Sequence, residues 1–72
     1  MKIKVNTIQD VIDFVQLVTE NCHGEVLAKQ GKYIINAKSI MGLFSLDLMK
    51  SFDLTGEEEI DKNIFKNFIA EE

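Results

Sequence analysis

The spacing of the apolar residues in this chain alternates between a period of two and a period of three to four, which limits the folds it can adopt. The opening run MKIKV has apolar side chains at every second position and predicts a short strand. The next run, NTIQDVIDFVQLVTENCHG, has helical spacing, and Gly24 stands where that helix is expected to end. The expected buried stripe of this helix contains Ile8, Val11, Ile12, Val15 and Val18, widened by Phe14 and Leu17.

The middle of the chain predicts a hairpin followed by a second helix. In EVLAKQGKYIINA, two runs rich in β-forming residues flank Gln30 and Gly31, a turn pair in which glycine supplies a positive φ. The second helix is expected from about Lys38 to Met49, with apolar residues along one side.

The last third predicts a strand and a helix. KSFDLT has two apolar residues two positions apart, which indicates a short fourth strand. A last helix is expected from about Glu57 to the end of the chain, with Thr55 and Glu58 at the spacing of a capping box. The order βαββαβα predicts an α+β sandwich, with helices on one face of a mostly antiparallel sheet. Periodicity does not determine the order of the strands.

Length and charge exclude several classes of function. The 72 residues predict one small domain, residues 1–72, with a thin core and little room for an enzyme cleft; we expect no catalytic activity and no cofactor. The net charge is −4 and the chain contains no arginine. Nucleic acids and anionic membrane surfaces both require clustered cations, so neither is expected as a partner.

The cysteine content predicts a reducing, cytoplasmic location. Cys22 is the chain's single cysteine, so no disulfide and no site with several cysteine ligands forms within the chain. No metal site is expected, because Cys22 and His23 are adjacent and supply too few ligands. The alternating MKIKVN start lacks the apolar core of a signal peptide, and no segment approaches the length of a membrane span.

Ser39 is the most informative polar residue, because it stands at the start of the apolar run in NAKSIMGLFSLDL. A serine in that position is a natural helix N-cap. The start of a helix also favours an anion, so a phosphate on Ser39 is compatible with the helix. Ile40, Met41 and Phe44 follow at helical spacing and are expected to form either core or a contact surface.

The segment AKSIMGLFSLDL resembles the second helix of HPr, the histidine phosphocarrier of the bacterial sugar phosphotransferase system. Its KSIMG sequence, the following SL and the FVQLV of the first helix carry the resemblance, which covers about residues 1–55. The resemblance implies an open-faced sandwich of four antiparallel strands in the order 1-4-2-3, with the helices on one side. It also implies that Ser39 is the site modified by a regulatory serine kinase.

The chain departs from HPr at the residues that carry phosphate. Alignment on the first helix sets Thr7 at the position of the family's phosphorylated histidine, Gln9 at its arginine and Asp10 at its proline. A threonine phosphoester is too stable to pass phosphate onward, and Asp10 repels an incoming phosphoryl group. Thr7 and Asp10 instead have the spacing of a capping box. His23 is expected at the other end of this helix, where it does not replace the missing imidazole.

The sequence therefore predicts a non-catalytic, HPr-like regulatory or protein-interaction domain, similar in its missing histidine to the catabolite-repression relatives of HPr. The expected partner surface contains Thr7, Gln9, Ile40, Met41 and Phe44. The expected partners are proteins: a serine kinase, a transcriptional regulator or a phosphotransferase-system component. Two alternatives stay open: a working phosphocarrier that uses another residue, and a structural domain in which Ser39 is a cap and nothing more.

Overall fold

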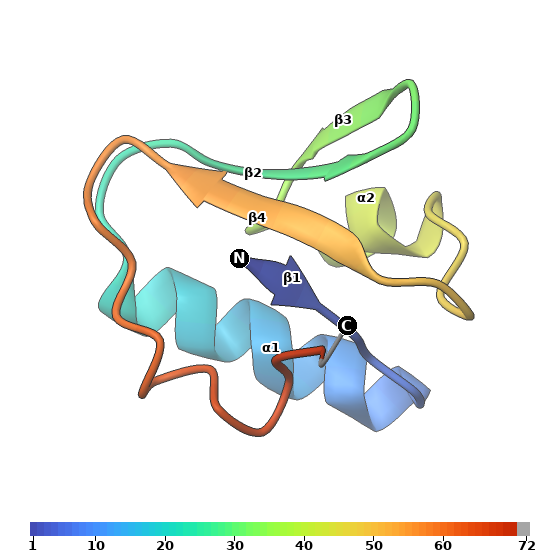
Figure 1. Ribbon diagram of the computed structural model, residues 1–72, viewed down its shortest axis with the longest axis horizontal. Helices are drawn as coiled ribbons and strands as arrows, with labels where there is room; N and C mark the ends of the chain where they lie inside the picture. The colour runs from blue at the N-terminus through green and yellow to red at the C-terminus, as the bar shows by residue number, and fades with distance from the viewer. Residues whose placement is uncertain (71–72) are drawn as a thin grey trace.

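The computed structural model describes residues 1–70, which form a sheet of four strands and two α-helices (Figure 1). In chain order, these elements are β1 (Lys2–Ile3), α1 (Ile8–Asn21), β2 (Val26–Gln30), β3 (Tyr33–Asn36), α2 (Ile40–Phe44) and β4 (Phe52–Gly56).

The sheet is antiparallel throughout, with the strands in the order β1-β4-β2-β3. The predicted α+β class and the 1-4-2-3 order are therefore confirmed. In the register of the sheet, Ala28 of β2 lies opposite both Ile35 of β3 and Leu54 of β4, so these three side chains share one face. Ala28 and Leu54 are buried on that face, whereas Lys29 on the other face is exposed.

Both helices cover this buried face, which Figure 1 shows as the underside of the sheet. Helix α1 contributes Phe14, whose ring packs edge-on against Phe52 of β4 at a centroid distance of 5.7 Å. Helix α2 approaches β3 closely at Gly42, where an added Cβ would lie 3.4 Å from the Ile35 side chain. The opposite face of the sheet carries no helix in the described part of the chain (Figure 1).

The β2–β3 turn differs by one residue from the expected one. Gln30 is the last residue of β2 and pairs with Tyr33, so the two central residues of the turn are Gly31 and Lys32. Gly31 has a φ of 57°, as a type II′ turn requires at its first central position. The prediction that glycine supplies the positive φ is confirmed, but the placement of the turn at Gln30-Gly31 is wrong.

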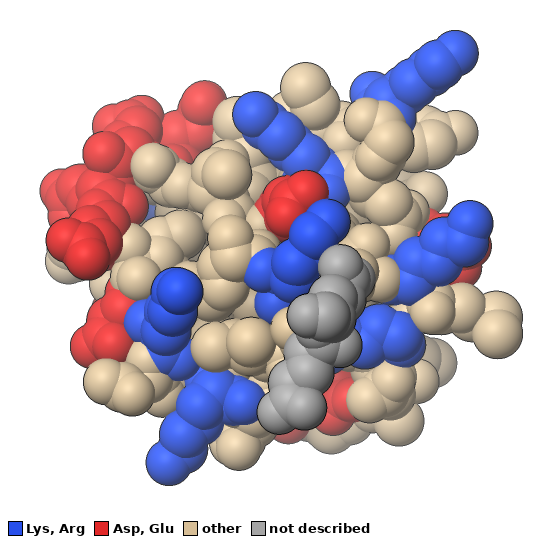
Figure 2. Space-filling view, in the orientation of Figure 1, with Lys and Arg blue, Asp and Glu red and all other residues tan. Residues whose placement is uncertain are grey.

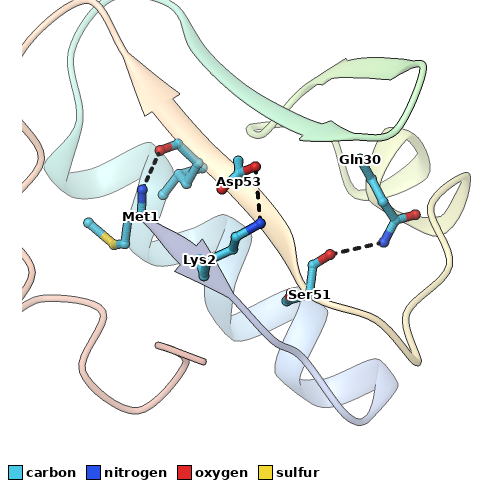
Figure 3. Close-up of polar contacts among 6 residues, drawn as sticks. Met1, Lys2, Gln30, Ser51 and Asp53 are labelled. Atoms are coloured by element: carbon cyan, nitrogen blue, oxygen red, sulfur yellow. Dashed lines mark hydrogen bonds and ion pairs between the residues drawn. The ribbon is translucent and has the colours of Figure 1, made fainter. Parts of the chain in front are cut away.

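Helix α2 is shorter than expected: it begins at Ile40 and ends at Phe44 instead of extending to Met49. The following loop is held by other parts of the protein. The Gln30 side chain accepts a hydrogen bond from the Asp47 N–H at 2.7 Å and donates to the Asp47 carbonyl oxygen at 2.8 Å. It also donates to the Ser51 carbonyl oxygen at 3.3 Å, the bond that Figure 3 shows. The Asp47 carboxylate accepts from the Met49 N–H at 3.0 Å, a local bond that competes with helix formation.

The expected last helix is absent, and this prediction is wrong for residues 57–70; its expected end at 71–72 lies outside the described residues. The segment has isolated turns with hydrogen bonds from residue i to residue i−3, for example from the Phe68 N–H to the Phe65 carbonyl at 2.8 Å. Thr55 lies within β4, so it forms no capping box with Glu58.

The C-terminal segment departs from a helix because it pairs with β1. Ile69 forms an antiparallel bridge with Ile3, the Lys4 N–H donates to the Phe68 carbonyl at 2.8 Å, and the Ala70 N–H donates to the Lys2 carbonyl at 3.0 Å. These contacts require extended backbone near residue 69. The segment therefore covers the outer edge of β1, as the red end of the ribbon shows in Figure 1.

Phe14 joins this segment to the rest of the core. Its ring lies 5.5 Å from that of Phe65 and 5.8 Å from that of Phe68, in addition to its contact with β4. Phe14 and Phe65 are fully buried. No helix within residues 1–70 combines the length and the apolar composition that crossing a membrane requires.

We predict that Phe65→Ala destabilises the protein by about 3–5 kcal/mol, because it removes a fully buried ring from a small core. Urea unfolding followed by circular dichroism measures this loss. The control is Met49→Ala at a side chain that is 87% exposed, where a change below about 0.5 kcal/mol is expected. Equal effects of the two substitutions would show that residues 57–70 do not complete the core.

Candidate functional site

Thr7 caps the start of helix α1, and Asp10 makes a return bond as in a capping box, but to the N–H of Asn6 instead of that of Thr7. Thr7 Oγ1 accepts a hydrogen bond from the Asp10 N–H at 3.0 Å, and Asp10 Oδ2 accepts one from the Asn6 N–H at 3.0 Å. The Thr7 carbonyl oxygen accepts the first helical bond, from the Val11 N–H at 3.2 Å. This helix start is thus stabilised by the chain's own side chains.

The charge at this end of α1 is unfavourable for a phosphoryl group. Gln9 lies on the exposed surface and donates from Nε2 to Asp13 Oδ1 at 2.9 Å, so its amide is held along the helix. Asp10 and Asp13 place two carboxylates in the first two turns. Near Thr7 the structure therefore offers a hydroxyl, two carboxylates and the Lys4 ammonium, which donates to Asn6 Oδ1 at 2.9 Å, and neither an imidazole nor a guanidinium group.

His23 lies beyond the other end of α1, which has 14 residues and therefore extends roughly 20 Å. It lines a small hollow of about 80 Å³ together with Glu58, Glu59 and Asp61. The carboxylates that line this hollow disfavour an anion such as phosphate there. The structure thus agrees with the expectation that His23 is remote from the start of α1.

Cys22 lines the same hollow and is half-buried. Burial raises the pKa of the Cys22 thiol; the Lys38 ammonium opposes this rise and the Glu58 carboxylate adds to it. A thiol with a raised pKa is a poor nucleophile near neutral pH. No three His, Cys, Asp or Glu side chains within residues 1–70 form a group that could hold a metal ion.

Ser39 is the N-cap of α2, as predicted. Its Oγ accepts a hydrogen bond from the Gly42 N–H at 3.0 Å, and its carbonyl oxygen accepts one from the Leu43 N–H at 3.1 Å. The residue is half-buried, and Gly42 allows this close approach because an added Cβ would lie 3.3 Å from the Ser39 Oγ. The neighbouring Lys38 Nζ is 3.0 Å from the Gly24 carbonyl, to which it donates.

Three of the predicted partner residues extend outward from α2. Met41 is 82% exposed, Phe44 45% and Ile40 39%, whereas Leu43 of the same helix is fully buried. Leu43 thus anchors α2 to the core, and the other large apolar side chains of the helix remain in contact with solvent.

Helix α1 adds two exposed apolar residues that sequence reasoning assigned to the core. Ile8 is 68% exposed and Ile12 39%, although both were expected in the buried stripe. The buried residues of α1 are Val11, Phe14, Val15 and Val18. Helical geometry, at about 100° per residue, gives the signal that was missed: Ile8 and Ile12 lie to one side of the stripe that these four residues define.

The exposed residues of α1 face toward α2. Phe14 lies on the opposite side of the buried stripe from Ile12, and it contacts the C-terminal segment beside β1. Helix α2 contacts α1 and β3, and β3 is the edge of the sheet opposite β1, so α2 lies on the other side of α1 from the C-terminal segment. The residues Ile8, Ile12, Ile40, Met41 and Phe44 are hereafter called the apolar surface.

Of the predicted site residues, Thr7 and Gln9 lie at the exposed start of α1 and Ser39 at the start of α2, with the exposed residues of α2 immediately after it. Comparison with family models, curated proteins and solved structures finds no match to this chain. The relation to HPr therefore stays a prediction that depends on the sequence motif.

We predict that Thr7→Ala destabilises the protein by about 0.5–2 kcal/mol, because the Asp10 N–H loses its side-chain acceptor. Thr19→Ala is the matched control, since Thr19 is exposed in the last turn of α1 and alanine has the higher helix propensity. Thermal unfolding of the two variants measures the difference. A loss at position 7 no greater than that at position 19 would contradict the capping role.

Proposed function

We propose that this protein is a non-catalytic relative of HPr, a regulatory domain that binds a partner protein through the apolar surface and is regulated by phosphorylation at Ser39. The observation that carries the proposal is the exposure of Ile40, Met41 and Phe44 directly after that serine. The partner is a serine kinase, a transcriptional regulator or a component of the phosphotransferase system.

The apolar surface has the properties of a protein contact site. Contiguous exposed apolar groups on a small protein indicate a binding surface, and methionine adapts its shape to a partner. Met41 is the most exposed residue of the apolar surface, and it lies on α2 between Ile40 and Phe44 in the sequence. A partner that covers these side chains would remove them from water, which favours binding.

The residues at the start of α1 support the part of this proposal that excludes phosphoryl transfer. Thr7 stands at the position of the HPr histidine and serves as a helix cap. The nearby carboxylates of Asp10 and Asp13 disfavour a phosphorylated donor protein at this point. His23 lies beyond the far end of the helix, beside a hollow lined in part by carboxylates.

Phosphorylation fits the local structure of Ser39. The serine oxygen already accepts a hydrogen bond from the Gly42 N–H, and a phosphate oxygen is a stronger acceptor of the same bond. The added negative charge would lie beside Ile40 and change which partners the apolar surface binds. A cytoplasmic location is part of this proposal, because it gives Ser39 access to a kinase and keeps Cys22 reduced.

The test is phosphorylation by the serine kinase of the phosphotransferase system with ATP, followed by mass spectrometry. We expect one phosphate on Ser39, none on Ser39→Ala, and modification of Met41→Asp that is slower by about tenfold or more, because a carboxylate at the centre of the contact disrupts docking. Met49→Asp is the matched control, since Met49 is also a highly exposed methionine but lies outside the apolar surface.

The controls separate docking from folding. Circular dichroism is expected to show the same folded content in the Met41 and Met49 variants, because both side chains are exposed. Equal rates for these two variants would contradict a role of the apolar surface. Complete absence of modification at Ser39 would instead favour the structural alternative, in which its hydroxyl is a helix cap.

A further inference from the structure

Strand β3 is the open edge of the sheet. The outer edge of β1 is covered by the pairing of Ile69 with Ile3, whereas no strand of residues 1–70 pairs with the outer side of β3. Figure 1 shows β3 at the top of the molecule, with α2 beneath it and nothing beyond it. An uncovered edge presents backbone donors and acceptors to an incoming strand.

The hairpin register determines which backbone groups point outward. Gln30 and Tyr33 close the two-residue turn, and the Ala37 N–H donates to the Val26 carbonyl at 2.9 Å. Because hydrogen bonding alternates along an antiparallel strand, the backbone of Ile34 points away from β2, as does that of Asn36. The Asn36 carbonyl accepts from the Ser39 N–H at 3.0 Å, so the groups that face solvent are the N–H and C=O of Ile34 and the N–H of Asn36.

Strand β3 is short, but it lacks two of the features that protect an edge. Its four residues, YIIN, include no charged residue and no proline. Tyr33 and Ile34 are each 61% exposed. An incoming strand would therefore gain both main-chain hydrogen bonds and apolar contact.

The surroundings of β3 favour an acidic strand. Lys32 precedes β3, and with Lys50, Tyr33 and Asp47 it lines an open hollow of about 530 Å³, completed by Gln30 and Gly31. Within the described residues, neither Lys32 nor Lys50 forms a salt bridge. The salt bridge in this part of the chain joins Lys2 to Asp53 (Figure 3).

The charges are also separated over the molecule. In Figure 2, lysines extend from the upper right, where Figure 1 places the β2–β3 hairpin, whereas carboxylates gather at the upper left, where β4 ends. The hairpin end is thus positive on a protein with a net charge of −4. Such a local field attracts an acidic segment.

We propose that β3 binds an extended, acidic segment of a partner protein, which adds to the sheet as a fifth, antiparallel strand. The partner exchanges main-chain hydrogen bonds with Ile34, and one of its carboxylates lies in the hollow between Lys32 and Lys50. A second copy of this chain fits less well, because β3 contains no carboxylate to pair with the opposing Lys32. This surface is separate from the apolar surface, so the inference does not depend on the proposed function.

The test begins with selection of binders from a random-peptide display library on the immobilised protein. We expect the selected peptides to alternate β-branched or aromatic residues with Asp or Glu. A synthetic copy of a selected peptide should shift the backbone amide signals of Ile34 and Asn36 in NMR spectra and slow their hydrogen exchange.

Charge-reversal variants then test whether Lys32 contributes to binding of the acidic peptide. Lys32→Glu is expected to weaken binding of that peptide by about tenfold or more, whereas the control Lys66→Glu, at an exposed lysine of the C-terminal segment, leaves it unchanged. The proposal is overturned if no acidic peptide is selected, if the selected peptide shifts residues of α2 instead of β3, or if the two variants bind it equally. It is also overturned if sedimentation shows self-association that protects Ile34 without peptide, since a second copy is then the occupant.

Discussion

Phe14 of α1 contacts three aromatic rings from two parts of the core that are distant from it in sequence. Its ring packs on Phe52 of β4 and on Phe65 and Phe68 of the C-terminal segment, while the rest of its helix covers the sheet. A domain of this size buries little surface, so each of these rings is a large part of its stability. The same contacts fix the rotation of α1, and this rotation sets which of its side chains face the core and which face solvent.

That rotation connects the fold to the proposed function. With Phe14 directed toward the C-terminal segment, Ile8 and Ile12 lie on the side of α1 next to α2, where Ile40 and Phe44 are also exposed. The core is thin, so it covers one stripe of α1 and one residue of α2, Leu43. The remaining apolar side chains form a surface that a partner can cover, and the capped, acidic start of α1 lies beside it.

The sequence correctly predicted the elements in which the local pattern of apolar and capping residues agrees with the tertiary contacts that the element makes. Helix α1, its Thr7 cap, the hairpin and the Ser39 cap follow from local patterns, whereas the strand order came from the resemblance to HPr. The prediction of a last helix was wrong. Ile64, Phe65 and Phe68 have helical spacing, but the pairing of residues 68–70 with β1 outweighs this weak local preference. The end of α2 was missed for a similar reason: Gln30, distant in sequence, binds the backbone of Asp47. The exposure of Ile8 and Ile12 could have been inferred from their angular position on α1, but only once Phe14 was known to lie at the opposite side of the buried stripe.

The central proposal is that this chain carries no transferable phosphate, because Thr7 is a helix cap and His23 lies at the far end of α1, beside a hollow lined in part by carboxylates. Incubation with phosphoenolpyruvate and the general first enzyme of the phosphotransferase system, followed by intact-mass measurement at neutral pH, tests it most directly, with an authentic HPr in the same reaction as the positive control. We predict an unchanged mass for this chain while the control gains a phosphate. An acid-labile phosphate on any residue of this chain would contradict the claim.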